Sequence, residues 1–382
     1  MKILYITTHF LSNSSASIRN ISLVNGLIEN GCEVEILTVQ VKEDEYLKEK
    51  LSSKVKIKKK IPIDFYNKIT SKEIKKYTQI KILKNIKEKL KSWIIFPDVY
   101  NIAIKKITKE KIIQGEYNYI ISSSDSKSSH FMALELIKKN NLNIDWIQIW
   151  GDPWYSDINV EKSIFFKKRI RKNEEKLLGL AKKVFYISAL TSKNIKETYP
   201  LYEKKIESLG RSFLEKIEHA PLEKNEIVFV YTGTLKKRNI NYLVQKIKSY
   251  NKNNYKKIKL KIYGDFFEES EYITSKERVS YKEVIEAYKE ADVLIYIDNQ
   301  GQTTQIPGKI YDYFGTNKTI LGLYERKDTY NFLKDFKRIE LMKNEEKFIE
   351  LEKLLQNIKV REVLDEFSPK MVAANFVEKI RN

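Results

Sequence analysis

The sequence is poor in the residues that form disulfides and bind metals. Its single cysteine, Cys32, excludes an internal disulfide and a zinc site built from cysteines. With three histidines in all, His9, His130 and His219, a site of several histidines is not expected either. The sequence therefore predicts no metal and no bound cofactor.

Long apolar runs are also missing. No stretch approaches the roughly 20 apolar residues that a membrane-spanning helix needs. The first residues, MKILYITTHF, lack the basic segment, the apolar run and the cleavage site of a secretory signal peptide. On these grounds we expect a cytoplasmic protein.

The chain does have enough apolar sequence for two cores. It has 382 residues, of which 42% are hydrophobic and 32% are charged, a composition typical of globular proteins. Because single domains commonly hold about 100 to 200 residues, this length predicts two domains. A cleft between the two lobes is expected.

Positive charge is concentrated in one segment. The formal net charge is +20, and residues 48–91 contain 16 Lys against 4 acidic residues. Apolar residues recur there every three or four positions, as in an amphipathic helix; they are Tyr77, Ile80, Leu83, Ile86, Leu90 and Trp93. The segment suits an anionic membrane surface or a nucleic acid, whereas a general abundance of lysine in the chain would need no partner.

Apolar runs alternate with helical patterns in both halves of the chain. Helices are expected near 18–28, 128–140, 241–250 and 281–291. The apolar runs predict strands at 2–7, 34–39, 117–124, 146–150, 182–188, 227–233, 257–264, 278–281, 292–297 and 316–324. This alternation predicts an α/β fold with two doubly wound parallel sheets, whose ligands bind beyond the carboxyl ends of the strands.

The alternation breaks between residues 205 and 222, which marks a domain boundary. We assign 1–205 to an N-terminal domain, with a basic amphipathic insertion at 48–96, and 206–365 to a C-terminal domain. A last helix at 366–382 is expected to cross back to the N-terminal domain.

Two segments of the second half suit a diphosphate. In YTGTLKKRN, Gly233 follows a strand and precedes a helix, and the nearby cations are Lys236, Lys237 and Arg238. A glycine at such a turn is often purely structural.

In the second segment, IPGKIYDYF, Pro307 and Gly308 prepare a turn and Lys309 falls in the first turn of a helix, where anions are favoured. Asp312 follows on the same side of that helix and suits a ribose diol. An ordinary surface pair of Lys309 with Asp312 is the alternative. A third segment, VSYKEV, would place Ser280 or Tyr281 beside a nucleotide base.

These segments resemble a known enzyme family. IPGKIYDYFGTNKTILGL is similar to the PxKxxEYLxxGKPIL segment of family 4 glycosyltransferases, which are retaining enzymes of the GT-B fold. The resemblance extends over the whole chain, through SSASIRN, WIIFPDVYNIAIKK, YIISSSDSKSSH, IDWIQIWGDPWYSD, RKNEEKLLGLAKKVFYIS and YTGTLKKRN. It implies a GT-B fold, in which two Rossmann-like domains face a central cleft.

The resemblance also implies an activity and its partners. The enzyme would move a sugar from a nucleoside-diphosphate donor, such as a UDP- or GDP-sugar, to a lipid-linked or polysaccharide acceptor in bacterial surface-glycan synthesis. It would do so with retention and without a metal. We assign the basic insertion to docking on the anionic inner face of the plasma membrane, and we expect no nucleic-acid partner.

Residue roles are carried over from matching positions. The implied catalytic residues are Lys309, Arg238, His130 and Asp152. The implied donor-site residues are Gly233, Thr234, Tyr281, Thr304, Ile306, Pro307, Gly308 and Asp312. The implied acceptor-side residues are Ser15, Arg19 and Trp154.

The chain departs from the family pattern at three of these positions. Asp312 stands where the family usually has Glu, which shortens the reach to a ribose. Thr304 stands where many relatives place the first carboxylate of a Glu pair, so Gln302, Thr303 and Gln305 would have to replace it. Thr234 takes the place of an arginine. A sugar-nucleotide 2-epimerase and a non-catalytic nucleotide-sugar-binding protein of the same fold are the alternative functions.

Overall fold

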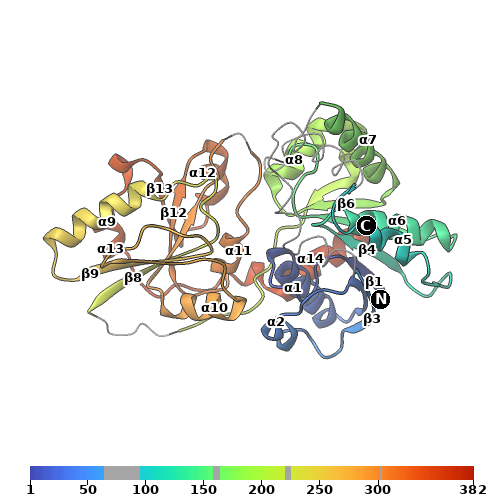
Figure 1. Cartoon of the computed structure of the whole chain (residues 1–382), viewed down its shortest axis with the longest axis horizontal. Coiled ribbons are helices and arrows are strands. Elements are labelled where there is room, and N and C mark those ends of the chain that lie inside the picture. Colours follow the sequence, from blue (N-terminus) through green and yellow to red (C-terminus); the bar gives the residue numbers. More distant parts are fainter. Residues whose placement is uncertain (64–94, 158–163, 220–224, 302) are drawn as a thin grey trace, which may run out of the picture. The chain divides into compact units, whose positions relative to one another are not determined.

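The computed structural model describes residues 1–63, 95–157, 164–219, 225–301 and 303–382. They form two compact units (Figure 1). Unit 1 comprises Met1–Leu209 together with Ala373–Asn382, and unit 2 comprises Gly210–Val372.

The described part of unit 1 is built on a seven-stranded parallel sheet with the strand order β3-β2-β1-β4-β5-β6-β7. Its strands are β1 (Lys2–Thr7), β2 (Glu33–Val39), β3 (Lys56–Ile61), β4 (Tyr119–Ser123), β5 (Asp145–Trp150), β6 (Lys183–Tyr186) and β7 (Ile206–Ser208). Its helices are α1 (Ser15–Glu29), α2 (Glu45–Glu49), α5 (Asn101–Ile107), α6 (Ser128–Lys139), α7 (Ile164–Leu180) and α8 (Ala189–Thr198), with a 3-10 helix at Pro200–Lys205.

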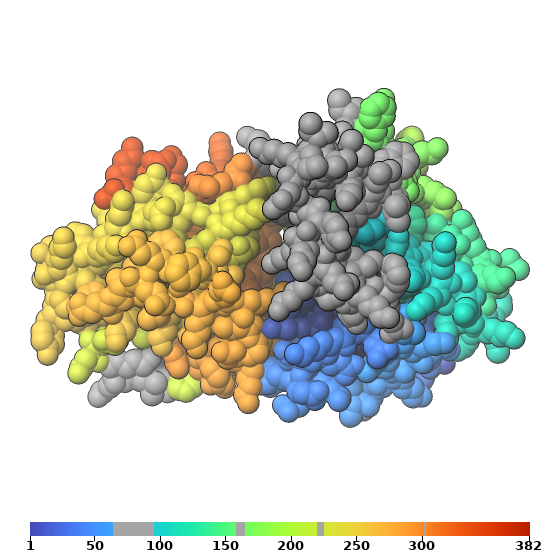
Figure 2. Space-filling model, in the orientation of Figure 1, coloured from blue at the N-terminus to red at the C-terminus, as the bar shows by residue number. Residues whose placement is uncertain are grey.

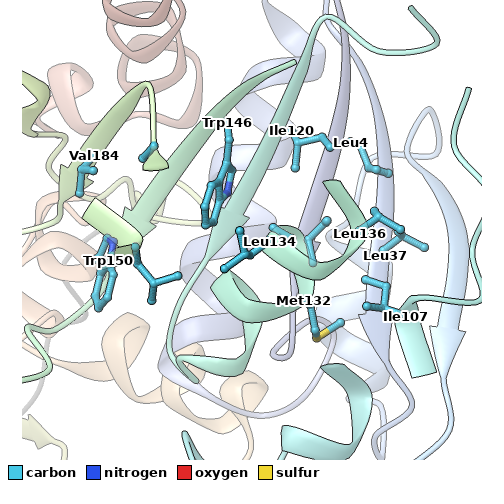
Figure 3. Packing of buried hydrophobic residues seen from close by; sticks show 14 of the residues in the cluster. Leu4, Leu37, Ile107, Ile120, Met132, Leu134, Leu136, Trp146, Trp150 and Val184 are labelled. Atoms are coloured by element: carbon cyan, nitrogen blue, oxygen red, sulfur yellow. The ribbon is translucent and has the colours of Figure 1, made fainter. Parts of the chain in front are cut away.

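The central strands of unit 1 are buried because helices cover both faces of a parallel sheet. Figure 3 shows how side chains of the sheet meet those of α5 and α6 in one apolar cluster. Trp146 and Trp150 of β5 lie in this cluster with Met132, Leu134 and Leu136 of α6. This packing fixes the loops that leave the carboxyl ends of the strands.

The last helix, α14 (Pro369–Arg381), brings the end of the chain to unit 1. Phe376 is fully buried and its ring lies 5.0 Å from that of Phe185 in β6. The Lys379 ammonium donates a hydrogen bond to the carbonyl of Ser208, 3.0 Å away. Apolar packing and charge-assisted hydrogen bonds thus hold residues 373–382 on this sheet.

Unit 2 repeats the architecture, with a six-stranded parallel sheet among its described residues in the order β10-β9-β8-β11-β12-β13. Its strands are β8 (Glu226–Thr232), β9 (Lys257–Tyr263), β10 (Ile273–Lys276), β11 (Val293–Ile297), β12 (Thr319–Tyr324) and β13 (Ile339–Lys343). Its helices are α9 (Asn241–Asn253), α10 (Tyr281–Glu290), α11 (Lys309–Phe314), α12 (Lys327–Leu333) and α13 (Leu351–Gln356), with 3-10 helices at Glu346–Phe348 and Asp365–Phe367.

Each sheet has a topological switch point. In unit 1 the chain proceeds outward from β1 to β2 and later restarts at β4 on the other side of β1; in unit 2 the same reversal occurs between β8 and β11. Loops at such a point part to opposite faces and leave room for a ligand at the carboxyl ends.

One predicted strand is wrong in position. The sequence predicts a strand at 278–281, but the strand is β10, Ile273–Lys276. Ser280 instead caps α10: its side chain accepts a hydrogen bond from the Glu283 amide while the Glu283 carboxylate accepts one from the Ser280 amide. This capping box starts a helix where an apolar pattern had indicated a strand.

Most of the predicted basic insertion, residues 64–94 of 48–96, lies outside the described residues, and so does the predicted amphipathic helix. The part that is described includes β3, which lies in the segment coloured light blue in Figure 2. Lys58, Lys59 and Lys60 of β3 form ion pairs with Glu116, Glu110 and Glu43, respectively. These three lysines therefore offer less net charge to an anionic surface than the sequence indicates. Within the described ranges, every helix is too short or too polar to cross a membrane.

The first prediction concerns the cap of α6. Asp98 accepts hydrogen bonds from the Ser128 amide (2.8 Å), the Ser128 hydroxyl (2.7 Å) and the Tyr100 amide (3.0 Å). Because Asp98→Ala leaves these donors unpaired, we expect it to lower the free energy of unfolding of unit 1 by about 1 to 2 kcal/mol.

Urea unfolding followed by tryptophan fluorescence measures this, because all four tryptophans of the chain precede Leu209. Asp44→Ala is the control, since Asp44 caps the five-residue α2 through a single hydrogen bond from the Leu47 amide. An equal or smaller loss in Asp98→Ala than in the control would contradict the proposed cap.

Candidate functional sites at the carboxyl edges of the two sheets

In unit 2 the loops that follow β8 and β9 approach each other unusually closely. Gly233 ends the β8 run with φ +135°, and its amide donates a hydrogen bond to the Tyr263 carbonyl, 2.7 Å away. A Cβ atom on Gly264 would lie 3.0 Å from the carbonyl of Gly233. Because both positions are glycine, the backbones of the two loops can lie in direct contact at the edge of the sheet.

Arg238 folds back over this turn. Its Nη1 donates to the Thr234 carbonyl (2.8 Å) and to the Tyr231 hydroxyl (3.3 Å), and its Nε donates to Oδ1 of Asn299 (3.1 Å). The side chain is partly exposed, so it presents a fixed positive charge at the carboxyl edge. Thr234 is exposed, and its hydroxyl donates to Asp265 over 3.1 Å.

The loop after β11 joins the same edge. Asn299 links it to Arg238, and the Gln300 amide donates to the Lys237 carbonyl over 2.7 Å. Residues 299–300 thus connect the turn at 233–238 to the loop that leads into 306–312, because Asn299 also donates to the Gln305 carbonyl at 3.2 Å. Thr304, Ile306 and Pro307 of this loop are partly exposed, and Gln302 lies outside the described residues.

Lys309 begins α11, which has only six residues. A dipole that short adds little for an anion, so the case for a phosphate here depends on the Lys309 charge itself. The Lys309 side chain is 27% exposed and pairs with Asp312 at 3.6 Å. Burial lowers the pKa of Lys309, and the negative charge of Asp312 opposes that shift.

Asp312 is enclosed rather than open to a ribose. Its side chain is 1% exposed, and Arg211, itself 4% exposed, donates to it at 3.1 Å. The guanidinium of Arg211 lies against Gly308, where a Cβ atom would collide with it. A ribose would reach this carboxylate only after Arg211 moved away, so the ribose contact stays a prediction that this geometry does not favour.

Tyr281, which the sequence places beside a base, is only 2% exposed and starts α10. Its ring has almost no surface for stacking on a base, because it packs into unit 2.

Unit 1 gathers a second cluster at the ends of β1, β4 and β5. Arg19 of α1 donates to the Ser124 carbonyl, and both Arg19 and Asp125 lie where a Cβ atom on Gly151 would be. The Lys127 ammonium donates to Asp125 and to the Asp152 carbonyl, each at 2.7 Å. Arg19 and Lys127 are 8% and 7% exposed, so two buried cations face two carboxylates.

The two carboxylates of this cluster differ in acidity. Burial acts to raise the pKa of Asp125, but Lys127 and Arg19 outweigh it and lower the pKa to about 2. Burial and the nearby negative charge of Asp125 raise the pKa of Asp152 to about 7. When two carboxylates lie close together, their pKa values move apart, because ionising both is unfavourable. Asp152 is therefore the carboxyl that exchanges a proton near neutral pH.

His130 is placed differently from the sequence expectation of a side chain facing a cleft. It is fully buried, its ring stacks on Trp150 at 4.3 Å, and its Nδ1 lies 2.8 Å from the Ser122 hydroxyl. Burial, together with the positive charge of Lys127, lowers its pKa well below the ordinary value, so the ring is neutral. With no exposed atom in this structure, His130 packs in the core, and its catalytic role stays a prediction.

The two remaining acceptor-side residues also differ in exposure. Trp154 is 5% exposed and stacks on Phe96 at 5.3 Å, so its ring contributes to packing rather than to an open sugar surface. Its amide donates to the buried carboxylate of Glu174 at 2.9 Å, which fixes the loop that carries Asp152. Ser15 is exposed at the start of α1.

Sequence reasoning missed several charged residues of these clusters. Asp125 and Lys127 were inside a segment quoted for the resemblance, but their pairing depends on contacts with the β5 loop that no spacing reveals. Arg211 fell in the boundary segment and pairs with a residue 101 positions later. Within the described ranges, no group of three or more His, Cys, Asp or Glu is arranged to hold a metal ion.

The fold is shared with solved enzymes. No family model matches the chain, and no curated protein matches it in sequence. Among solved structures, sucrose-phosphate synthase from Thermosynechococcus elongatus superposes with a TM-score of 0.58 at 11% identity, covering 100% of this chain and 98% of that one. A UDP-GlcNAc 2-epimerase from Neisseria meningitidis, bound to UDP-GlcNAc, gives 0.54 at 10% identity and covers all of both chains. The chain has the GT-B fold. At these identities the likeness concerns the architecture of the two Rossmann-like units and leaves the activity open.

The second prediction concerns the buried ion pair of Arg211 with Asp312 in unit 2. Asp312→Leu would leave the Arg211 charge buried without its partner, so we expect a loss of about 3 to 5 kcal/mol in the stability of unit 2. The double variant Arg211→Met with Asp312→Leu should recover most of this loss, because both charges are gone. Calorimetric unfolding of the two variants measures it, and a double variant that is less stable than Asp312→Leu would contradict the pairing.

The third prediction uses pH. In the folded protein Asp152 keeps its proton up to about pH 7, whereas an unfolded aspartate loses it near pH 4. The stabilisation from this raised pKa is complete below about pH 4 and is lost as the pH rises to about 7. Asp152→Asn should therefore gain stability relative to wild type across this window and show a constant difference above it.

Asp125→Asn should show the opposite sign. Its folded pKa of about 2 stabilises the protein above about pH 4, and that contribution disappears as the pH falls toward 2. Urea midpoints by tryptophan fluorescence between pH 3 and pH 8 measure both. A pH-independent difference for Asp152→Asn would show that this carboxyl has an ordinary pKa.

Proposed function

We propose that the chain is a glycosyltransferase that takes a sugar from a nucleoside-diphosphate donor bound at the carboxyl edge of unit 2. The observation that carries the proposal is the joined edge, in which 233–238 and 299–305 are hydrogen-bonded: it links a glycine turn and the charge of Arg238 to the loop that leads into α11, where Lys309 stands. Both side chains are partly exposed, so they remain available to a phosphate.

The chemistry needs such charges. In the transfer, the bond between the anomeric carbon and a diphosphate oxygen breaks, and its electron pair leaves with the diphosphate. The acceptor oxygen forms the new bond to the same carbon, and its proton passes to the departing diphosphate. Arg238 and Lys309 stabilise the negative charge that grows on the leaving group, and preorganised charges of this kind need no metal.

The finer parts of the proposal follow the sequence resemblance. They are a family 4 enzyme that acts with retention, a UDP- or GDP-sugar donor, and a lipid-linked or polysaccharide acceptor bound to unit 1. In unit 1, Asp152 accepts a hydrogen bond from an acceptor hydroxyl, and Arg19 holds the Ser124 backbone next to it. Solved relatives in fold include an epimerase bound to UDP-GlcNAc, which supports a nucleotide-sugar ligand for the architecture.

We also propose docking on the anionic inner face of the plasma membrane. It depends on the basic insertion, and the described lysines 58–60 are already ion-paired. Most of the other lysines of the docking segment, 48–91, lie outside the described residues.

A sugar-nucleotide 2-epimerase is the second candidate. It is favoured by Asp152 of unit 1, whose pKa of about 7 suits a group that removes and returns a proton near neutral pH. Incubation with UDP-GlcNAc, UDP-Glc and GDP-Man separates the candidates. A transferase moves label to an added membrane-glycan extract, an epimerase forms the C2 epimer without it, and a non-catalytic protein binds nucleotide and does neither.

The fourth prediction concerns the two cations. Lys309→Ala and Arg238→Ala should each lower turnover of the donor by about 100- to 1000-fold, because each removes a charge that stabilises the leaving diphosphate. Lys248→Ala is the control: it removes an exposed lysine of α9 that has no role in the donor site, and it should change turnover less than twofold. Initial rates of nucleoside-diphosphate release measure all three, and near-normal rates in both site variants would refute the assigned donor site.

A further inference from the structure

Asp298 is a buried carboxylate that none of the predicted roles uses. It follows β11 directly and is 0% exposed. Its Oδ1 accepts from Nη2 of Arg326 at 2.6 Å and from the Asn299 amide at 2.8 Å. Its Oδ2 accepts from the amides of Glu325 and Arg326 and from Nε of Arg326, at 3.2 to 3.3 Å. A buried carboxylate of this kind is stable only when its oxygens are paired, and here every partner comes from a loop at the carboxyl edge.

Arg326 extends the connection to the loop before α11. Besides Asp298, its guanidinium donates to the carbonyls of Thr303 and Gln305 and to the Thr329 hydroxyl. One planar group therefore joins the end of β11, the start of α12 and the backbone of 303–305. This is the loop in which Thr304 stands where the resembled family has a carboxylate.

Asn299 carries the connection to the opposite side. Its Nδ2 donates to the Gln305 carbonyl at 3.2 Å, and its Oδ1 accepts from Nε of Arg238 at 3.1 Å. Asn299 is 8% exposed, so its amide has little freedom to turn. The orientation of Arg238 is thereby coupled to a loop that the Asp298–Arg326 pair holds.

We propose that the Asp298–Arg326 pair is a positioning device for the donor diphosphate: it fixes 303–305 and, through Asn299, aims the guanidinium of Arg238. The pair itself does not contact the ligand. The identity of the ligand, a nucleoside diphosphate, rests on the proposed function.

The physical reason is preorganisation. A free arginine side chain loses rotamer entropy when it is fixed. Arg238 is fixed before binding by Asn299, the Thr234 carbonyl and the Tyr231 hydroxyl, so a ligand meets a cation already in place. Loosening the loop would return that freedom and weaken binding without removing any charge from the site.

Arg326→Lys tests this, because it keeps the charge beside Asp298 and loses the bonds to the two loop carbonyls. Asn299→Ala is the second variant; it removes the bridge between Arg238 and the Gln305 carbonyl while keeping the Asp298–Arg326 pair, and it carries the test if Arg326→Lys does not fold. Arg361→Lys is the matched control. Arg361 pairs with Glu340 at 2.9 Å in the same unit, and its side chain is 14% exposed against 16% for Arg326.

The first readout is hydrogen exchange of the peptide spanning 299–308, which needs no ligand. We expect faster exchange in Arg326→Lys and unchanged exchange in Arg361→Lys. Equal exchange in wild type and Arg326→Lys would overturn the holding role, whatever the protein binds.

The second readout is the Kd for UDP and for GDP, measured by calorimetry. We expect a rise of about tenfold in Arg326→Lys and in Asn299→Ala, and less than twofold in the control. In the background of Arg238→Ala these two variants should have almost no further effect, because the cation they position is gone.

If Arg326→Lys and Asn299→Ala raise the Kd by the same factor in the Arg238→Ala background as in wild type, they do not act through Arg238. That result would show a merely structural role and overturn the link to Arg238. If the wild-type protein binds neither UDP nor GDP, the proposed function fails, and the exchange measurement still decides whether the pair holds the loop.

Discussion

Close approach of backbone and charge at the carboxyl edges of the two sheets is the constraint on which the candidate sites depend. Gly264 lets the β9 loop meet Gly233, Gly308 leaves room for the Arg211 guanidinium, and Gly151 does the same for Arg19 and Asp125. A single methyl group at any of these positions would occupy space that a charged group or a neighbouring backbone now fills. The parallel sheets place these loops at one edge, and the glycines leave space there for the charged groups and the neighbouring backbone.

Charges brought this close must be paired, and the pairing decides which groups stay available. Asp312 and Asp298 are both buried and both held by arginines, so neither is open to a ligand. The Arg238 and Lys309 side chains are partly exposed, so these two cations of unit 2 can contact a diphosphate. In unit 1, Lys127 is committed to Asp125, which leaves Asp152 to titrate near pH 7. Each edge therefore presents a different chemistry: fixed positive charge in unit 2 and an exchangeable proton in unit 1.

Much of the fold was predictable because helix-covered parallel strands require long apolar runs. The runs at 2–7, 146–150 and 292–297 correspond to β1, β5 and β11, which are buried on both faces. β3 was not predicted: its sequence, KIKKKI, is a lysine-rich edge strand that ion pairs make compatible with the sheet. β13 was missed as well, because IELMK at the other sheet's edge has only two buried residues.

The sites were predictable only in outline. Glycine turns and a lysine after Pro307 mark the edge of unit 2 in the sequence, since they are local features. The partner of Asp312 is not local, so a ribose contact was the natural expectation until Arg211 was found against it. His130 likewise follows a polar loop, and only the ring of Trp150, twenty residues later, shows that it is buried. The spacing of residues in the sequence indicates local features such as turns, whereas the burial of a side chain and its ion-pair partner depend on the folded structure.

Hydrogen exchange of the whole chain with and without UDP or GDP shows whether a nucleoside diphosphate binds at the carboxyl edge of unit 2. We expect slower exchange in both 233–238 and 303–309 when nucleotide is present, since one diphosphate would contact both segments. Protection confined to residues at the opposite edge of the same sheet, around Lys318 and Lys359, would contradict it.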